Sequence, residues 1–201
     1  MERFEIVLAC PSCHVGARLT AFEPDDTDQA ITWTDGYREI AGVPPPLQLV
    51  RCCACNAFYW TDMATPVLEP LASDSVAEIE TPDENSYYEA IDRGLGSDQE
   101  RELALRVLAW WRGNDRFRKD AARDRYPTDR RAIRNIERLV DLCGDGNHEI
   151  LLTRVEALRQ LGRFDEASET LAGICSDYEL AAVRYGSLIA AHSRHLEILF
   201  D

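Results

Sequence analysis

Four cysteines in two C-x-x-C pairs are the residues whose type and spacing point most clearly to chemistry. Cys10 and Cys13 form the first pair in CPSCH, and Cys52 and Cys55 form the second in CCAC. A C-x-x-C turn holds two thiolates on one side of an ion, and two such turns complete the tetrahedral shell that Zn²⁺ prefers. The pattern therefore predicts a structural zinc site with these four cysteines as its ligands.

The residues beside each pair fit the backbone of a zinc knuckle. His14 and Asn56 each follow the second cysteine of a pair, where a knuckle usually has Gly because the chain turns through the left-handed region. Asn and His are among the few other residues enriched at positive φ. We therefore expect a positive φ at both positions.

The cysteines also allow interpretations other than a zinc site. A thioredoxin-type redox pair needs a strand-to-helix junction at the motif, and neither HVGARLTAFEP nor NAFYWTDMATP resembles a long helix. The thiols can also be unliganded, or Cys53 or His14 can replace one of the four ligands. The 38 residues between the pairs exceed the roughly 15–20 of a compact site. The connecting segment must therefore extend away from the site and return to it. A closed four-thiolate shell leaves no position for water, which argues against metal catalysis.

Composition limits the class of protein. The chain has 201 residues, seven cysteines and a net charge of −14, and residues 1–96 hold 17 acidic and 5 basic side chains. Such an acidic half repels phosphate backbones and disfavours nucleic acid as its partner. No apolar run approaches the roughly 18 residues of a membrane span, and the N-terminus lacks the pattern of a secretion signal. We expect a cytoplasmic protein without a membrane partner, where reducing conditions disfavour disulfides.

Short strands are predicted around the cysteine pairs. The segment AITWTDGYREI has the form of a hairpin with Asp35-Gly36 at the centre of a type I′ turn. Residues 47–51 and 58–60 are expected as strands on either side of the second pair. The aromatic residues at 58–60 are expected to cover the zinc site, because nearby Arg and Lys residues that would favour a platform for stacked bases are lacking.

The second half changes to the 3.6-residue period of helices. The predicted helices cover 87–93, 97–112, 127–143, 148–161, 164–175 and 178–200, with Gly113-Asn114-Asp115 breaking the second. Trp110 and Trp111 are adjacent, so one is expected in the core and the other against a neighbouring helix or in solvent. The predicted fold is α+β: a β-rich zinc-ribbon-like domain at 1–63, an extended acidic, proline-containing linker at 64–86, and an all-α domain of helical hairpins at 87–201.

Two resemblances follow from these motifs. Residues 148–175 resemble one tetratricopeptide repeat, with matches at Leu158, Gly162, Phe164, Ala167 and Leu171. The whole chain resembles a group of uncharacterised bacterial proteins with an N-terminal zinc-ribbon-like domain followed by tetratricopeptide-like helices. The matching segments are Cys10-Cys13, Trp33-Thr34-Asp35-Gly36, Pro44-Pro45-Pro46, Cys52-Cys55 with Tyr59-Trp60, and Ala109-Trp110-Trp111 with Asn114-Asp115. His14, Cys53 and Asn56 depart from a pattern of Gly, Pro and Gly. The resemblance implies an architecture and no activity.

These features predict a non-enzymatic adaptor whose helical half binds another protein. Stacked helical hairpins form concave surfaces that bind peptides or helices. The candidate contact region is 112–138, which has ten basic and five acidic residues, and its candidate partner-binding residues are Arg130, Arg131 and Arg134.

The sequence also allows functions other than an adaptor. The main alternative is a zinc-ribbon protein that binds nucleic acid or takes part in transcription, using the same arginines. No nucleophile elbow, phosphate-binding Gly loop or metal-type carboxylate pair in the sequence supports an enzyme. A regulatory hypothesis is that the acidic N-terminal half or linker covers the basic helices.

Overall fold

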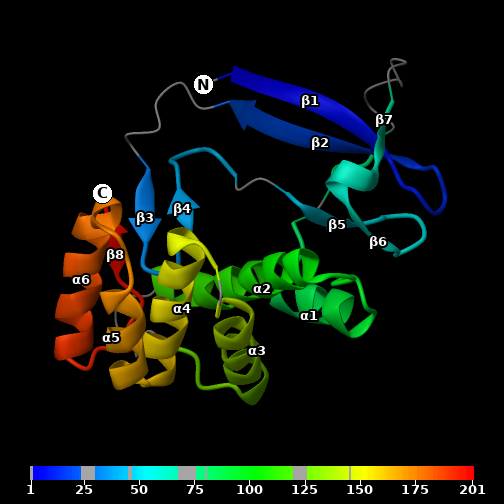
Figure 1. Ribbon diagram of the computed structural model, residues 1–201. Helices are drawn as coiled ribbons and strands as arrows, with labels where there is room; N and C mark the ends of the chain where they lie inside the picture. The colour runs from blue at the N-terminus through cyan, green and yellow to red at the C-terminus, as the bar shows by residue number, and fades with distance from the viewer. Residues whose placement is uncertain are drawn as a thin grey trace.

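The fold combines a small β-rich N-terminal part with a row of helices, as a computed structural model of the chain shows (Figure 1). The structure describes residues 2–23, 30–44, 47–67, 76–79, 81–119, 126–144 and 146–201. This organisation confirms the predicted α+β class. None of the described helices is long and apolar enough to cross a membrane.

Two β-hairpins carry the two cysteine pairs. β1 (Glu2–Ala9) pairs antiparallel with β2 (Gly16–Glu23), and the first pair lies in the turn between them. β5 (Leu49–Arg51) pairs antiparallel with β6 (Phe58–Trp60) on either side of the second pair, which confirms the strands predicted there. Each C-x-x-C motif is therefore held at the end of a hairpin.

The described parts of the predicted linker run along the N-terminal sheet. β7 (Thr65–Pro66) pairs with the edge of β1. Further on, the backbone N–H of Arg18 donates to Ala77 O, and the N–H of Ile79 donates to Arg18 O, at 2.8 Å each. Residues 68–75 and 80 lie outside the described residues, as do Pro45 and Pro46 of the proline segment. The linker and the domain boundaries stay predictions.

The hairpin predicted between the cysteine pairs forms with a different turn. β3 (Ile31–Trp33) pairs antiparallel with β4 (Arg38–Glu39). The N–H of Trp33 donates to Tyr37 O and the N–H of Gly36 donates to Trp33 O, both at 2.9 Å, so the loop has three residues. Gly36 has a φ of +79°, but Asp35 is not among the residues with positive φ. The type I′ prediction is wrong because the longer loop uses a type I turn followed by one left-handed Gly.

The last segment of the chain is a strand, so the prediction of a helix over 178–200 is wrong there. α6 (Glu179–Ala190) ends, and His192 takes a left-handed φ of 50° that a right-handed helix cannot contain. β8 (Ile198–Phe200) then pairs antiparallel with β3, giving the sheet order β4-β3-β8. Ile and Phe favour strands where a sheet edge is available, and β3 supplies that edge.

Six α-helices are described, and consecutive helices pack against one another (Figure 1). They are α1 (Glu84–Asp92), α2 (Gln99–Lys119), α3 (Arg130–Leu142), α4 (His148–Leu161), α5 (Phe164–Ala172) and α6, with short 3-10 helices at Thr61–Met63 and Ser176–Tyr178. The side chains of Asp83, Asp129 and Asn147 accept hydrogen bonds from backbone amides of the helices that follow them. Gly162, at a φ of 79°, ends α4 just before α5 and so forms the predicted helical hairpin.

The helix break predicted at Gly113-Asn114-Asp115 is wrong, because α2 continues through it to Lys119. At Gly113 a Cβ would lie 2.7 Å from Glu84 Oε1, so the missing side chain allows α1 to approach closely. Asn114 is fully buried, and its Nδ2 donates to Asp35 Oδ2 at 2.9 Å. Tertiary contacts thus override the weak helix propensity of Gly and Asn.

Two hydrophobic clusters hold the helices. The larger one lies among α2 to α6 and includes Trp110, Ile136 and Leu158. The second joins Phe58 and Trp60 of the β5–β6 hairpin to α1 and α2, so this hairpin rests on those helices. The prediction that one of the adjacent tryptophans enters the core is confirmed, since Trp110 is buried. Trp111 is half-buried and donates from Nε1 to Asp35 O at 2.9 Å, so it packs against the β3–β4 loop, which the sequence did not indicate.

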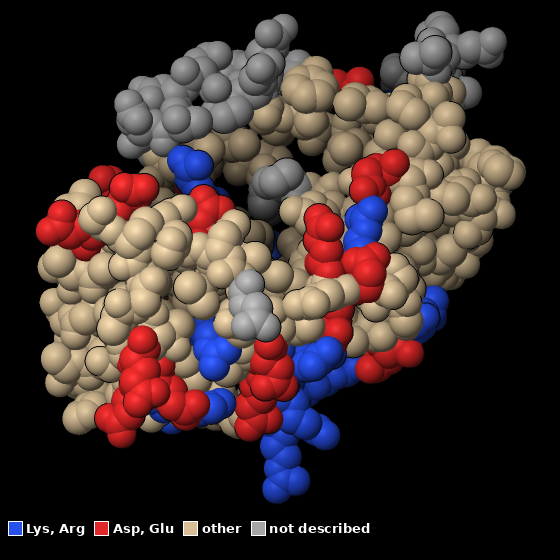
Figure 2. All heavy atoms as spheres, in the orientation of Figure 1, with Lys and Arg blue, Asp and Glu red and all other residues tan. Residues whose placement is uncertain are grey.

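Four exposed arginines lie on one helix of this row, α3. Lys and Arg side chains gather mainly along the lower edge in Figure 2, near the position of α3 in Figure 1, next to groups of Asp and Glu. Arg130, Arg131, Arg134 and Arg138 are all exposed on α3. The predicted contact residues therefore lie on the surface.

Candidate metal centre

The two cysteine turns have the same backbone geometry. In the first, Cys10 N donates to Val15 O at 3.0 Å and His14 N donates to Cys10 O at 2.9 Å. In the second, Cys52 N donates to Ala57 O at 2.9 Å and Asn56 N donates to Cys52 O at 3.0 Å. His14 has a φ of 62° and Asn56 a φ of 58°, which confirms the left-handed conformation predicted for both. The pairs are equivalent knuckles at the ends of two hairpins.

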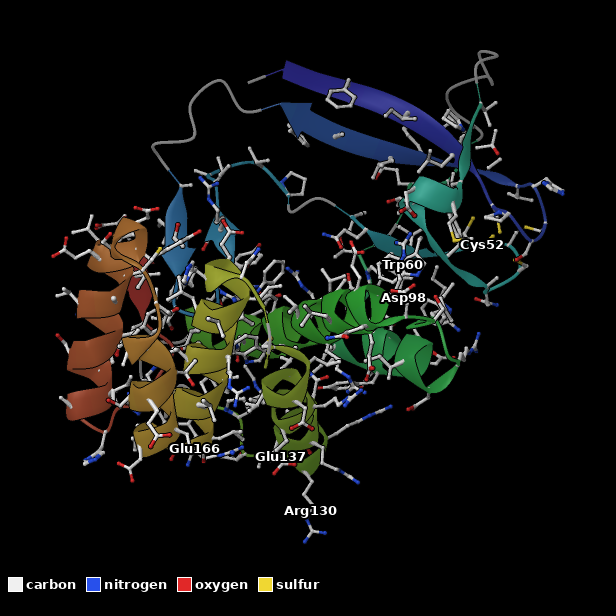
Figure 3. The ribbon with its side chains drawn as sticks, viewed as in Figure 1. Cys52, Trp60, Asp98, Arg130, Glu137 and Glu166 are labelled. Carbon is white, nitrogen blue, oxygen red and sulfur yellow. The ribbon has the colours of Figure 1, made fainter. Side chains whose placement is uncertain are left out.

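The four predicted sulfurs meet in one cluster. The Sγ atoms of Cys10 and Cys55 are 3.8 Å apart, and those of Cys13 and Cys52 are 3.5 Å apart. All four Sγ atoms lie within 4.8 Å of one another. Tetrahedral zinc with bonds of about 2.3 Å would separate its sulfurs by about 3.8 Å, so the donor set fits the ion. Figure 3 shows the sulfurs beside the labelled Cys52.

The sulfur cluster is covered from one side by the small N-terminal core. Cys10 and Cys52 are buried with Val50 and Tyr59, whereas Cys13 is half-buried and Cys55 is exposed. Burial, with the nearby cysteines, raises the pKa of Tyr59 to about 12. Phe58, Tyr59 and Trp60 are all at most 9% exposed, so these aromatic rings are core residues and not an open stacking surface.

Two thiols of the cluster, those of Cys52 and Cys13, have pKa values shifted in opposite directions. Burial raises the pKa of Cys52, but the amides of Cys55 and Ala54 and the Cys13 thiol outweigh it and lower this pKa to about 7. At Cys13 the amide of Val15 lowers the pKa, but burial and the neighbouring thiols outweigh it and raise the pKa to about 12. One thiolate thus forms at the expense of its neighbours. A divalent cation removes this conflict because it stabilises thiolates together.

The structure also places the other cysteines. The described cluster includes Cys52 and excludes its neighbour Cys53, whose side chain is exposed. His14 is not a member of this four-residue group. Cys143 and Cys175 lie in the helical part. The four cysteines that match the C-x-x-C spacing are therefore the ones whose sulfurs lie close together.

The predicted contact arginines lie far from this cluster in the fold. They occupy the first turns of α3, and Figure 3 shows Arg130 projecting away from the molecule at its lower edge, whereas Cys52 lies in the upper right of the view. Arg131 Nη2 is 2.7 Å from Asp92 Oδ2, and Arg134 Nε donates to Arg130 O at 3.3 Å. The sulfur cluster and the arginines are two separate features.

A buried polar network was missed by the sequence analysis. The Thr34 hydroxyl, in the β3–β4 loop, donates to Glu156 Oε1 at 2.8 Å. Arg159 donates from Nη2 and Nε to the two oxygens of Glu156, each at 2.7 Å, and from Nη2 to His195 O at 2.6 Å. The side chains of Glu156 and Arg159 are both fully buried. This network holds the hairpin loop, α4 and the C-terminal segment together.

The same loop contacts α2 through its acidic side chain. Asp35 is fully buried and accepts hydrogen bonds from Asn114 and from Arg118 Nη2. The sequence did contain a hint of this contact. The resemblance included polar residues in segments 33–36 and 109–115, but it did not indicate that the two segments are in contact. The loop between the cysteine pairs therefore packs into the helices, across the boundary predicted between the two domains.

The knuckle backbone gives a direct prediction at Asn56. Asn56→Val should lower the free energy of unfolding of the protein by about 1–2 kcal/mol, because a β-branched residue is strained in the left-handed region. Asn56→Gly should be tolerated. Urea denaturation followed by circular dichroism measures both. Ala54→Val, at an exposed position of the same turn without positive φ, is the control, and an equal loss there would contradict the explanation.

Comparisons with protein-family models, curated proteins and solved structures found no match for the chain. The resemblances to a tetratricopeptide repeat and to the bacterial zinc-ribbon group therefore stay predictions. The possible function rests on the geometry of the molecule itself.

Proposed function

We propose that the protein binds one structural Zn²⁺ through Cys10, Cys13, Cys52 and Cys55, and that it is a non-enzymatic adaptor whose helices bind another protein. The observation that carries the metal proposal is the convergence of four sulfurs, all within 4.8 Å, from two equivalent knuckles. The adaptor role rests on the exposed arginines of α3.

The donor chemistry favours zinc with a structural role. Four thiolates suit Zn²⁺, whereas Mg²⁺ and Ca²⁺ take oxygen ligands. Four protein ligands fill a tetrahedral shell and leave no position for a substrate or an activated water. The ion would join the β1–β2 hairpin to the β5–β6 hairpin, which also share a small core that includes Val50 and Tyr59.

Two observations weigh against the nucleic-acid alternative. The aromatic residues of β6 are buried and cannot stack on bases. The net charge of −14 opposes a long polyanion. A protein partner is the better match for a local basic surface on an acidic molecule.

Metal analysis directly tests the proposed zinc site. The protein purified without added metal should hold about one zinc per chain by elemental analysis, because a closed four-thiolate shell retains zinc strongly. Cys10→Ser combined with Cys52→Ser should abolish retention, while Cys53→Ser should not. Zinc far below one equivalent that cannot be restored by reconstitution under reducing conditions would contradict the metal assignment.

A further inference from the structure

A pocket of about 500 Å³ lies where α1, α2 and α3 meet. Its lining includes Tyr88 and Asp92 from α1, Arg106 from α2, and three arginines of α3. The three are Arg131, Arg134 and Arg138. The volume falls in the range of small-ligand pockets, roughly 300–1,000 Å³. Arg130 is not part of this lining, although it is on the same helix.

The guanidinium groups of the pocket are held in place but only partly engaged. Arg106 Nε and Arg138 Nη2 lie 2.8 and 2.9 Å from the two oxygens of Glu102, and Arg131 Nη2 lies 2.7 Å from Asp92. Arg131 also packs over the Tyr88 ring, at 4.6 Å from its centroid. In the described part of the chain, no acceptor contacts the two terminal nitrogens of Arg134. The pocket thus has unengaged N–H donors on arginine side chains that Glu102, Asp92 and Tyr88 hold in place.

Arginine predominates in the lining of the pocket. Four arginines and one acidic side chain, Asp92, line it, on a protein whose net charge is −14. Carboxylates just outside the lining act on the same residues: Glu102 and Asp141 on Arg138, and Glu84 and Asp129 on Tyr88. Hydrogen bonds from Arg138, opposed by burial and aided by Arg106, lower the pKa of Glu102 to about 2. The Arg131–Asp92 pair is exposed on both sides, and such pairs are weak enough to exchange for a better ligand.

We propose that this pocket binds the phosphoryl group of a phosphorylated side chain on a partner protein. This inference rests on the proposed adaptor function and names the chemistry of the partner. Arg134 and the free nitrogens of Arg131 and Arg138 donate to the phosphoryl oxygens, and Arg106 and Tyr88 hold the pocket in shape. Asp92 releases Arg131 when the phosphoryl group enters.

A phosphoryl group fits these donors better than a carboxylate does. A phosphorylated side chain carries about −1.5 to −2 charges at pH 7 and three acceptor oxygens, which can accept hydrogen bonds from the unengaged N–H groups of several arginines at once. A carboxylate has one charge and is satisfied by a single guanidinium. Nucleic acid presents a chain of phosphates, which the acidic remainder of the protein repels.

The test uses the full-length zinc-loaded protein and a minimal probe, N-acetyl-O-phosphoserine amide. Titration followed by amide chemical shifts should give saturable changes at α1, α2 and α3. N-acetylglutamate amide should bind at least about tenfold more weakly. Binding of the phosphoserine probe should weaken as the pH falls below about 6, where the phosphoryl group takes up a proton.

Two matched variants on one helix decide whether the pocket is responsible. Arg134→Ala should weaken phosphoserine binding by about tenfold or more, because it removes charge-assisted hydrogen bonds. Arg130→Ala removes the same charge outside the pocket and should weaken binding by less than about twofold. Circular dichroism confirms that both variants are folded.

Several outcomes would overturn the inference. The first two are a lack of saturable binding of the phosphoserine probe and equal losses of its affinity in the two variants. The others are binding of inorganic phosphate as tight as that of the probe, and binding of a short DNA duplex that is tighter than that of the probe and is abolished by Arg134→Ala. Zinc content is unaffected in each case, so failure here leaves the metal proposal standing. Loss of zinc binding with intact phosphoserine binding would instead contradict only the proposed metal site.

Discussion

Removing the proposed zinc should unfold the β1–β2 hairpin while the helices stay folded. Apparent binding free energies of structural zinc are about 10–16 kcal/mol in small domains, and that contribution is lost with the ion. Among the described residues, the core beside the sulfurs has four buried members, Cys10, Val50, Cys52 and Tyr59, which are too few to hold the β1–β2 hairpin without the ion. The larger cluster among α2 to α6 contains none of these residues. Stability is therefore unevenly divided.

Hydrogen exchange read by mass spectrometry, before and after treatment with a strong zinc chelator under reducing conditions, measures this division. Backbone amides of β1 and β2 should lose protection by orders of magnitude, those of β5 and β6 should lose less because this hairpin also packs on α1 and α2, and those of α3 to α5 should change little. Cys10→Ser should reproduce the loss without chelator. Cys53→Ser is the matched control, since it removes an exposed thiol next to the site. Unchanged protection of β1 and β2, or simultaneous loss in all helices, would contradict the prediction.

Breaking the buried pair at Glu156 should have the second-largest effect. Glu156→Ala should lower the free energy of unfolding by about 3–5 kcal/mol, because it leaves the guanidinium of Arg159 buried without a counter-charge. It also removes the acceptor of the Thr34 hydroxyl. The β3–β4 loop would then lose one of its attachments to α4.

Urea denaturation of the zinc-loaded protein measures this change, and the chain supplies its own control. Glu166 pairs with Arg163 at the same three-residue spacing, but both side chains are more than 40% exposed. Glu166→Ala should therefore cause a much smaller change, as expected for a solvated pair. Similar losses in the two variants would show that burial does not determine the effect of the Glu156 pair.

The parts of the structure that the sequence predicts best are set by neighbours in the chain. The C-x-x-C spacing and the left-handed tolerance of His14 and Asn56 act within six residues, and both features are present as expected. The α4–α5 hairpin is similarly marked by Gly162, whose conformation ends one helix before the next begins. Such signals need no knowledge of the rest of the fold.

The parts that could not be predicted depend on distant contacts. Gly113 and Asn114 look like a helix break, but Asp35 and Glu84 provide partners that make a continuous helix favourable. The segment at 198–200 forms a strand only because β3 offers an edge. The arginine pocket likewise exists because α1, α2 and α3 converge, and the sequence alone did not separate Arg131 and Arg134 from Arg130.

The pairing of β3 with β8 has a consequence for how the protein reaches its native state. Thr32 is opposite Phe200 and Trp33 is opposite Ile198, so nearly the whole chain lies between the paired strands. Closing so large a loop costs entropy that only the completed contacts return, and such pairings form late. A nascent chain on the ribosome cannot make this pairing until residues near 200 have emerged. We therefore expect the β3–β4 hairpin to complete its sheet only after β8 has been synthesised.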